Sequence, residues 1–132
     1  MKHTSRVNAI CLKAIFKYKE YVDKLKFREM LMSIRKLIIV TSEHDPLRSK
    51  IKKICNEIAE KHGVELDIKY EDWEFLRKYG EEDELGGYSF PQVFVEYDDG
   101  RIEHILTRIP LNNKGKLDGD LAMQIIEKKF SG

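Results

Sequence analysis

The stretch Ser89-Phe90-Pro91-Gln92-Val93-Phe94-Val95 joins a proline directly to a run of β-branched and aromatic residues. Because proline has no N–H to donate to a neighbouring strand, Pro91 must be the first residue of a strand or part of the turn before it. The run Val93–Val95 then predicts the strand itself. Asp98-Asp99-Gly100 follows, which is typical of a tight hairpin turn, and predicts a second strand from Arg101 to Leu106.

The chain upstream of this hairpin predicts a strand, a helix, a second strand and a short helix. The run Leu37–Thr41 begins with four apolar residues, which is typical of a strand buried on both faces in the middle of a sheet. Gly63 suits the end of the helix that follows, and alternation at Val64, Leu66 and Ile68 predicts the second strand. The apolar face of the helix comprises Leu47, Ile51, Ile54, Cys55 and Ile58, and the short helix Glu71–Tyr79 carries Trp73, Leu76 and Tyr79.

Two polar stretches predict loops. One is the acidic run Glu81-Glu82-Asp83-Glu84 with Gly86-Gly87, and the other extends from Pro110 to Gly119. We expect Asp120 to cap a last helix, since aspartate is a favoured N-cap residue. The inner face of that helix would comprise Leu121, Ala122, Ile125, Ile126 and Phe130. We find no internal repeat and no low-complexity segment.

Residues 1–35 predict a basic amphipathic helical extension, and residues 36–132 predict one α/β domain. The first apolar stripe of the extension comprises Val7, Ile10, Cys11, Ala14, Ile15, Tyr18, Tyr21, Val22 and Leu25, and the second comprises Phe27, Met30, Leu31 and Ile34. A face this long needs a partner surface, which is either its own domain or a second copy of the chain. We favour a homodimer.

The order helix, β, α, β, α, β, β, α resembles that of the thioredoxin superfamily, with an added N-terminal helix. The resemblance covers Lys36 to Phe130 and is closest to glutaredoxin-type domains. It implies an α/β fold with a four-stranded mixed sheet and flanking helices. It also implies that Pro91 follows a cis peptide bond and faces the family's active site.

The resemblance fails where the family carries its chemistry. Glutaredoxins have Cys-Pro-x-Cys at the start of the first helix of the domain, and Asp45-Pro46-Leu47-Arg48 stands there in this chain. Since a carboxylate and a guanidinium can neither attack nor resolve a disulfide, we expect the protein to be redox-inactive and the chain to have no catalytic residue of this class.

The pair Asp45-Pro46 has two interpretations. Aspartate suits an N-cap and proline suits the first helical position, so the pair is explained by helix structure alone, and we favour this. The alternative is a degenerate active-site groove that retains binding. Its candidate residues are His44, Asp45, Pro46, Arg48, Phe90 and Pro91.

Glutathione is not an expected ligand. In the family, the residue before the cis proline, here Phe90, offers its backbone to the glutathione cysteine. The Gly-Gly that helps to hold glutathione is missing, because Asp98-Asp99-Gly100 and Glu103 follow instead.

The cysteines and histidines indicate no metal and no cofactor. Cys11 and Cys55 form no C-x-x-C pair. We expect Cys55 to be an inert core residue, and a disulfide with Cys11 stays open if their helices dock. The histidines are scattered over the chain, at positions His3, His44, His62 and His104.

Charge is distributed unevenly although the net charge is only +1. Residues 1–36 hold ten Lys and Arg against three Asp and Glu, which gives this segment a net charge of +7. Its basic side chains could bind nucleic acid. We favour the alternative that they are the solvated side of the helix, or that they face the acidic remainder of the same chain or of a partner. The candidate basic surface comprises Lys13, Lys17, Lys19, Lys24, Lys26 and Arg28.

Neither a signal peptide nor a transmembrane run is indicated, so we expect a cytoplasmic protein that does not enter the membrane. The charged fraction of 36% also favours a thermophilic source. Our first functional hypothesis is a redox-inactive, thioredoxin-like homodimer that acts through protein–protein contacts. The alternatives are a nucleic-acid-associated protein that uses the basic helix and an enzyme with non-thiol chemistry at Asp45 and Arg48.

Overall fold

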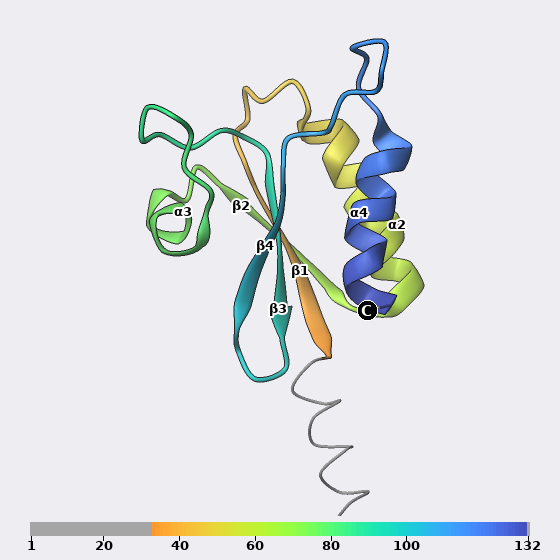
Figure 1. Ribbon diagram of the computed structural model, residues 1–132. Coiled ribbons are helices and arrows are strands. Elements are labelled where there is room, and N and C mark those ends of the chain that lie inside the picture. Colours follow the sequence, from red (N-terminus) through yellow and green to blue (C-terminus); the bar gives the residue numbers. More distant parts are fainter. Residues whose placement is uncertain (1–32, 132) are drawn as a thin grey trace, which may run out of the picture. The chain divides into compact units, whose positions relative to one another are not determined.

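The computed structural model describes residues 33–131, and every structural statement below concerns these residues. Figure 1 shows the helices and strands of this part of the chain in the order β1, α2, β2, α3, β3, β4 and α4. The elements are β1 (Ile34–Thr41), α2 (Arg48–His62), β2 (Glu65–Tyr70), α3 (Trp73–Tyr79), β3 (Gln92–Tyr97), β4 (Ile102–Thr107) and α4 (Gly119–Ser131).

The strands form one mixed sheet in the order β2-β1-β3-β4. β1 runs parallel to β2 and antiparallel to β3, and β3 and β4 form the expected antiparallel hairpin. Gly100 closes the hairpin turn with a φ of +90°, a conformation in which glycine has no side chain to clash. The prediction of an α/β domain with a four-stranded mixed sheet and flanking helices is confirmed.

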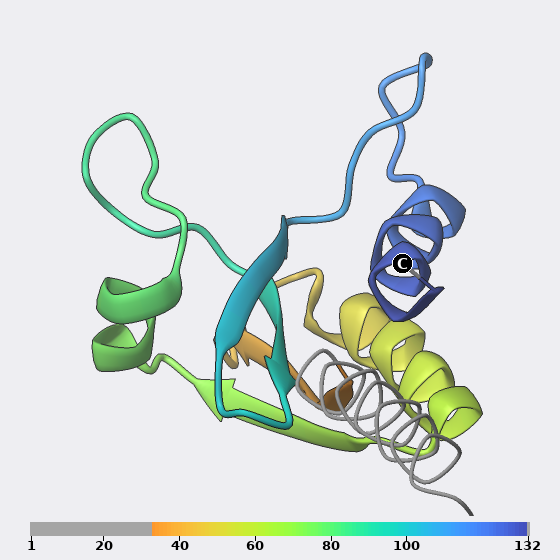
Figure 2. The same ribbon diagram turned by 60° about the horizontal axis from the view of Figure 1, so that its bottom comes forward.

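The apolar run of β1 is buried because helices cover both faces of the sheet at this strand. Leu37 and Ile39 pack in one core cluster with α2 and α4, whereas Ile38 and Val40 pack in a second cluster with Leu76 of α3. Figures 1 and 2 show the same arrangement, with α2 and α4 on one side of the sheet and α3 on the other. All four side chains are at most 1% exposed, and burial of each stabilises the fold by about 1.5–3 kcal/mol.

The starts of β1 and of α4 differ from the sequence predictions. Ile34, expected in the second helical stripe, is the first residue of β1, lies opposite Tyr97 and packs against the core. Strand pairing therefore outweighs the helical spacing that Ile34 shares with Phe27, Met30 and Leu31. The last helix begins at Gly119, and its cap is Asp118, whose Oδ1 accepts a hydrogen bond from the Leu121 N–H at 3.0 Å. Asp120 lies inside the first turn.

The predicted helical extension, its basic surface and Cys11 fall on residues 1–32, outside the described part of the chain. Its boundary with the domain stays a prediction. Among residues 33–131, no helix combines the length and the apolar character needed to cross a bilayer.

Candidate binding groove

A groove with a volume of about 380 Å³ lies at the end of the sheet where three loops meet. One loop follows β1, the second leads into β3, and the third follows β4, so the groove collects residues that are far apart in sequence. The Phe90–Pro91 peptide bond beside it is cis, as the resemblance implies. The lining residues are Ser42, His44, Asp45, Pro46, Leu47, Ser89, Phe90 and Arg108.

Four of the six candidate residues line this groove, namely His44, Asp45, Pro46 and Phe90. Pro91 is buried next to Phe90 and does not line it. Arg48 was also expected there, but it is the first residue of α2 and lies outside the lining. Side chains of successive helical residues point about 100° apart, so Leu47 and Arg48 point in different directions. The buried Leu47 is the one that lines the groove.

The carboxylate of Asp45 is held by two hydrogen bonds. Oδ2 accepts from the Thr41 hydroxyl at 2.6 Å, and Oδ1 accepts from the Leu47 N–H at 2.9 Å. The expectation that Asp45 caps α2 and Pro46 begins it is wrong, because α2 begins at Arg48 with Leu47 as the N-cap residue. Asp45 instead closes the turn before the helix, in the manner of an Asx turn. The two bonds fix the orientation of its carboxylate in the groove wall.

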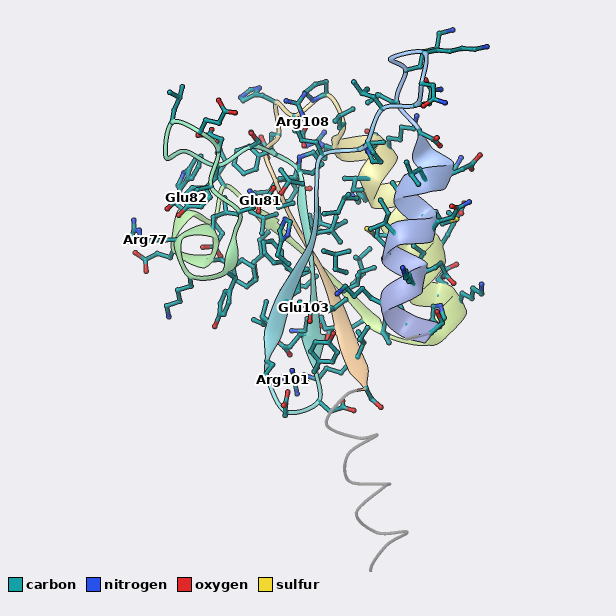
Figure 3. All side chains as sticks on the ribbon, in the orientation of Figure 1. Arg77, Glu81, Glu82, Arg101, Glu103 and Arg108 are labelled. Carbon is teal, nitrogen blue, oxygen red and sulfur yellow. The ribbon has the colours of Figure 1, made fainter. Side chains whose placement is uncertain are left out.

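The sequence analysis missed Arg108, which supplies the guanidinium at the groove (Figure 3). Its backbone N–H donates to the Pro91 carbonyl at 2.8 Å, and its φ of +64° is uncommon for a residue other than glycine. Strained backbone of this kind clusters at ligand sites. Arg108 is exposed and forms no ion pair with another residue of the range 33–131.

Phe90 gives the groove an apolar side and unused backbone groups. Within residues 33–131, neither its N–H nor its carbonyl forms a hydrogen bond. Its ring lies 5.3 Å, between centroids, from the ring of Trp73, which is 48% exposed. Trp73 is the single tryptophan of the chain, so its fluorescence reports on this edge of the groove.

A second residue that the sequence analysis missed is Gln92, which is fully buried at the start of β3. Its Oε1 accepts from the Glu81 N–H at 2.9 Å, and its Nε2 donates to the carbonyls of Glu81 and Ser89 at 3.0 and 3.1 Å. These three bonds hold both ends of the loop that leads to Phe90. The signal in the sequence was a polar residue at the start of an otherwise apolar strand. Because buried polar groups are almost always hydrogen-bonded, such a residue indicates hydrogen bonds to a neighbouring segment.

No thiol lies in the groove wall. Cys55 lies on the buried face of α2 and is fully buried in the core, as expected, and burial raises the pKa of its thiol to about 12. Its pairing with Cys11 falls outside the described residues. In the described range, we find no group of three or more His, Cys, Asp or Glu side chains that could hold a metal ion.

The groove therefore combines a guanidinium, the His44 ring and two serine hydroxyls with the apolar surfaces of Pro46 and Phe90. Such a wall can bind an extended ligand that carries carboxylate or carbonyl oxygens beside an apolar group. Comparison of the chain with family models, with curated proteins and with solved structures found no match.

Proposed function

We propose that the chain is a thioredoxin-like protein, closest to glutaredoxin-type domains, that has lost thiol chemistry and binds a segment of another protein in its groove. The sheet order β2-β1-β3-β4 and the cis bond before Pro91 support the fold assignment. One observation carries the functional part: Asp45 and Phe90 line the same groove of about 380 Å³, and no cysteine lines it.

Binding would use the groups that the groove leaves available. The Arg108 guanidinium suits a carboxylate or a backbone carbonyl of the ligand, because it presents several N–H donors in a fixed plane. The backbone N–H and carbonyl of Phe90 suit an extended strand, which pairs through main-chain hydrogen bonds. An extended peptide with an acidic side chain near an apolar one meets both requirements.

The groove lining, as described for residues 33–131, offers no thiol for electron transfer. The Asp45 carboxylate cannot form a mixed disulfide. Cys55 is the thiol among residues 33–131, and a pKa of about 12 keeps it protonated at neutral pH.

A reductase assay tests the loss of thiol chemistry. The purified chain is mixed with a fluorescent glutathione mixed-disulfide substrate and a thiol reductant, and release of the fluorophore is followed. We expect the rate to equal that of the reductant alone. Turnover that depends on the amount of the chain would contradict the proposal.

A peptide selection tests the groove. Peptides from a displayed random library are selected on the full chain and then counter-selected on Ser89→Trp, whose ring fills the groove. We expect peptides that bind the natural chain, change Trp73 fluorescence and fail on Ser89→Trp. The matched control is Asn56→Trp, on the exposed side of α2, which should bind them unchanged. Peptides that bind Ser89→Trp equally well would show that the groove is not the binding site.

The remaining hypotheses depend on other residues. The homodimer through the N-terminal stripes and nucleic-acid binding through the basic surface rest on residues 1–32, so both stay predictions. An enzyme that pairs Asp45 with Arg48 is disfavoured, since Arg48 does not line the groove and Asp45 is engaged by Thr41 and Leu47.

A further inference from the structure

Two loops project from the same end of the sheet, beyond the groove. Figures 1 and 2 show one on each side of the loop that follows β1. Each contains a short hairpin closed by a bridge between two residues, Glu82 with Tyr88 and Leu111 with Leu117. We call Glu82–Tyr88 the acidic hairpin and Leu111–Leu117 the basic hairpin.

The two hairpins have the same backbone design. The second residue of each donates its N–H to the carbonyl of the sixth, at 2.8 Å from Asp83 to Gly87 and at 2.7 Å from Asn112 to Lys116. The fifth residue of each is a glycine with positive φ, at +82° in Gly86 and +76° in Gly115. In both, Oδ1 of the second residue also accepts two backbone N–H groups. The donors are Leu85 and Gly87 to Asp83, and Lys114 and Lys116 to Asn112. These bonds hold the backbone of each hairpin tip in a defined shape.

Their charges are opposite. The acidic hairpin and the residue before it carry four exposed carboxylates, whereas the basic hairpin carries two exposed lysines and lies close in sequence to Arg108. None of these groups forms an ion pair within the range 33–131, although several charged side chains elsewhere in that range do. The carboxylates belong to Glu81, Glu82, Asp83 and Glu84, and the lysines are Lys114 and Lys116.

Both hairpins also expose apolar side chains. Leu85 is 96% exposed, Leu111 is 59% exposed and Leu117 is 41% exposed. Each hairpin therefore presents exposed leucine side chains beside charges that form no ion pair within residues 33–131, and protein contact surfaces combine groups of both kinds.

We propose that this face binds a second copy of the same chain, with the acidic hairpin of each copy against the basic hairpin of the other. A two-fold axis that runs between the hairpins, within the interface, brings opposite charges together twice. A two-fold axis along the line that joins the hairpins would place like charges together. Because each chain carries both the acidic and the basic hairpin, its surface is complementary to itself, and two copies can form a closed, symmetric homodimer. The inference goes beyond the proposed function and does not need it, since it uses the hairpins and not the groove.

A charge swap on the full chain tests this arrangement. One variant carries Glu82→Lys and Glu84→Lys, and the other carries Lys114→Glu and Lys116→Glu; Asp83 and Asn112 stay, so both hairpins keep their closing bonds. Analytical ultracentrifugation at low salt measures self-association of each variant and of an equimolar mixture with one variant fluorescently labelled. Controls with the same charge changes on the exposed side of α2 are Glu57→Lys with Glu60→Lys and Lys52→Glu with Lys53→Glu.

We expect each hairpin variant alone to self-associate at least about tenfold more weakly than the natural chain. The mixture should recover association, because each reversed hairpin then meets its reversed counterpart on the other variant. Added salt should weaken the natural assembly, and the α2 controls should behave like the natural chain. Leu85→Ser, at a fully solvated site, should also weaken it. The proposal is overturned if the natural chain shows no association step, if both hairpin variants associate unchanged, or if the mixture fails to recover.

Discussion

At the scale of single residues, the groove depends on a buried amide. Gln92 makes three hydrogen bonds to the loop that carries Glu81 and Ser89. Gln92→Leu would leave one N–H and two carbonyls without these partners, and we expect it to destabilise the fold by about 2 kcal/mol. Urea unfolding measures this, and limited proteolysis should show earlier cleavage between residues 80 and 91. The control is Gln124→Leu, on the exposed side of α4, and an equal effect there would refute the role of Gln92.

His104 links the stability of the fold to pH. Burial lowers the pKa of its ring below the ordinary value of 6.5, although the charge of Glu81 acts in the opposite direction, and Nε2 lies 2.7 Å from the Thr107 hydroxyl. As the pH falls through 6.5, the unfolded chain takes up this proton before the folded protein does. The stability that neutral His104 contributes is therefore complete above pH 6.5 and is lost progressively below it.

We expect the free energy of unfolding of the natural chain to fall more steeply between pH 7 and pH 5 than that of His104→Gln. Urea titrations at four pH values measure both slopes, and other titrating groups cancel in the comparison. Parallel curves for the natural chain and His104→Gln would contradict the argument.

The residues that line the groove were only partly predictable from the sequence. Asp45, Pro46 and Phe90 were named as groove candidates because the glutaredoxin resemblance places them at the family's Cys-Pro-x-Cys position and before its cis proline. Arg108 belongs to no such pattern, since it joins Asp45 only through the pairing of β1, β3 and β4 and through its positive φ. Arg48 was expected in its place because the resemblance fixes sequence spacing and does not fix the direction in which a side chain points.

At the scale of elements, the strands were predicted closely. An unbroken apolar run such as Leu37–Val40 indicates by its composition alone that the strand is buried. Helix starts were less accurate; at the start of α4, for example, two aspartates, Asp118 and Asp120, compete for the cap position. Asp118 makes the hydrogen bond to the Leu121 N–H, so Asp118→Ala should cost about 1 kcal/mol. Asp120→Ala loses only an interaction with the helix dipole and should cost a few tenths of a kcal/mol. Thermal unfolding compares the two, and a larger loss in Asp120→Ala would restore the sequence prediction.

The two hairpins were predicted only as polar loops, although both contain Asp or Asn followed three residues later by Gly. If this spacing sets the shape of the hairpins, the side-chain oxygen of Asp83 or Asn112 must be needed to close the turn. Asn112→Asp should keep slow amide exchange at Lys114 and Lys116, since a carboxylate accepts the same two bonds. Asn112→Ala should speed that exchange severalfold. Hydrogen exchange followed by NMR measures both variants, and equal rates in the two would exclude a closing role for Oδ1.

At the scale of the whole molecule, the start of β1 fixes how short a stable domain can be. A chain that begins at Lys36, where the sequence placed the domain boundary, lacks Ile34, Arg35 with its ion pair to Glu96, and the Ser33 carbonyl that accepts from the Asp98 N–H at 2.9 Å. We expect it to be less stable by about 1–2 kcal/mol than a chain that begins at Ser33. Urea unfolding compares them, and equal midpoints would show that the first residues of β1 contribute little.

The chain that begins at Ser33 also distinguishes self-association through the hairpins from self-association through the first 32 residues. Both core clusters and both hairpins lie within residues 33–131, so a chain that begins at Ser33 should fold and keep the association that the charge swap abolishes and the mixture restores. The helical stripes predicted before Ile34 are absent from it. Sedimentation at several concentrations, with and without added salt, measures the assembly. A shortened chain that stays monomeric where the full chain associates would assign the contact to the first 32 residues, whereas a salt-sensitive pair of shortened chains assigns it to the hairpins.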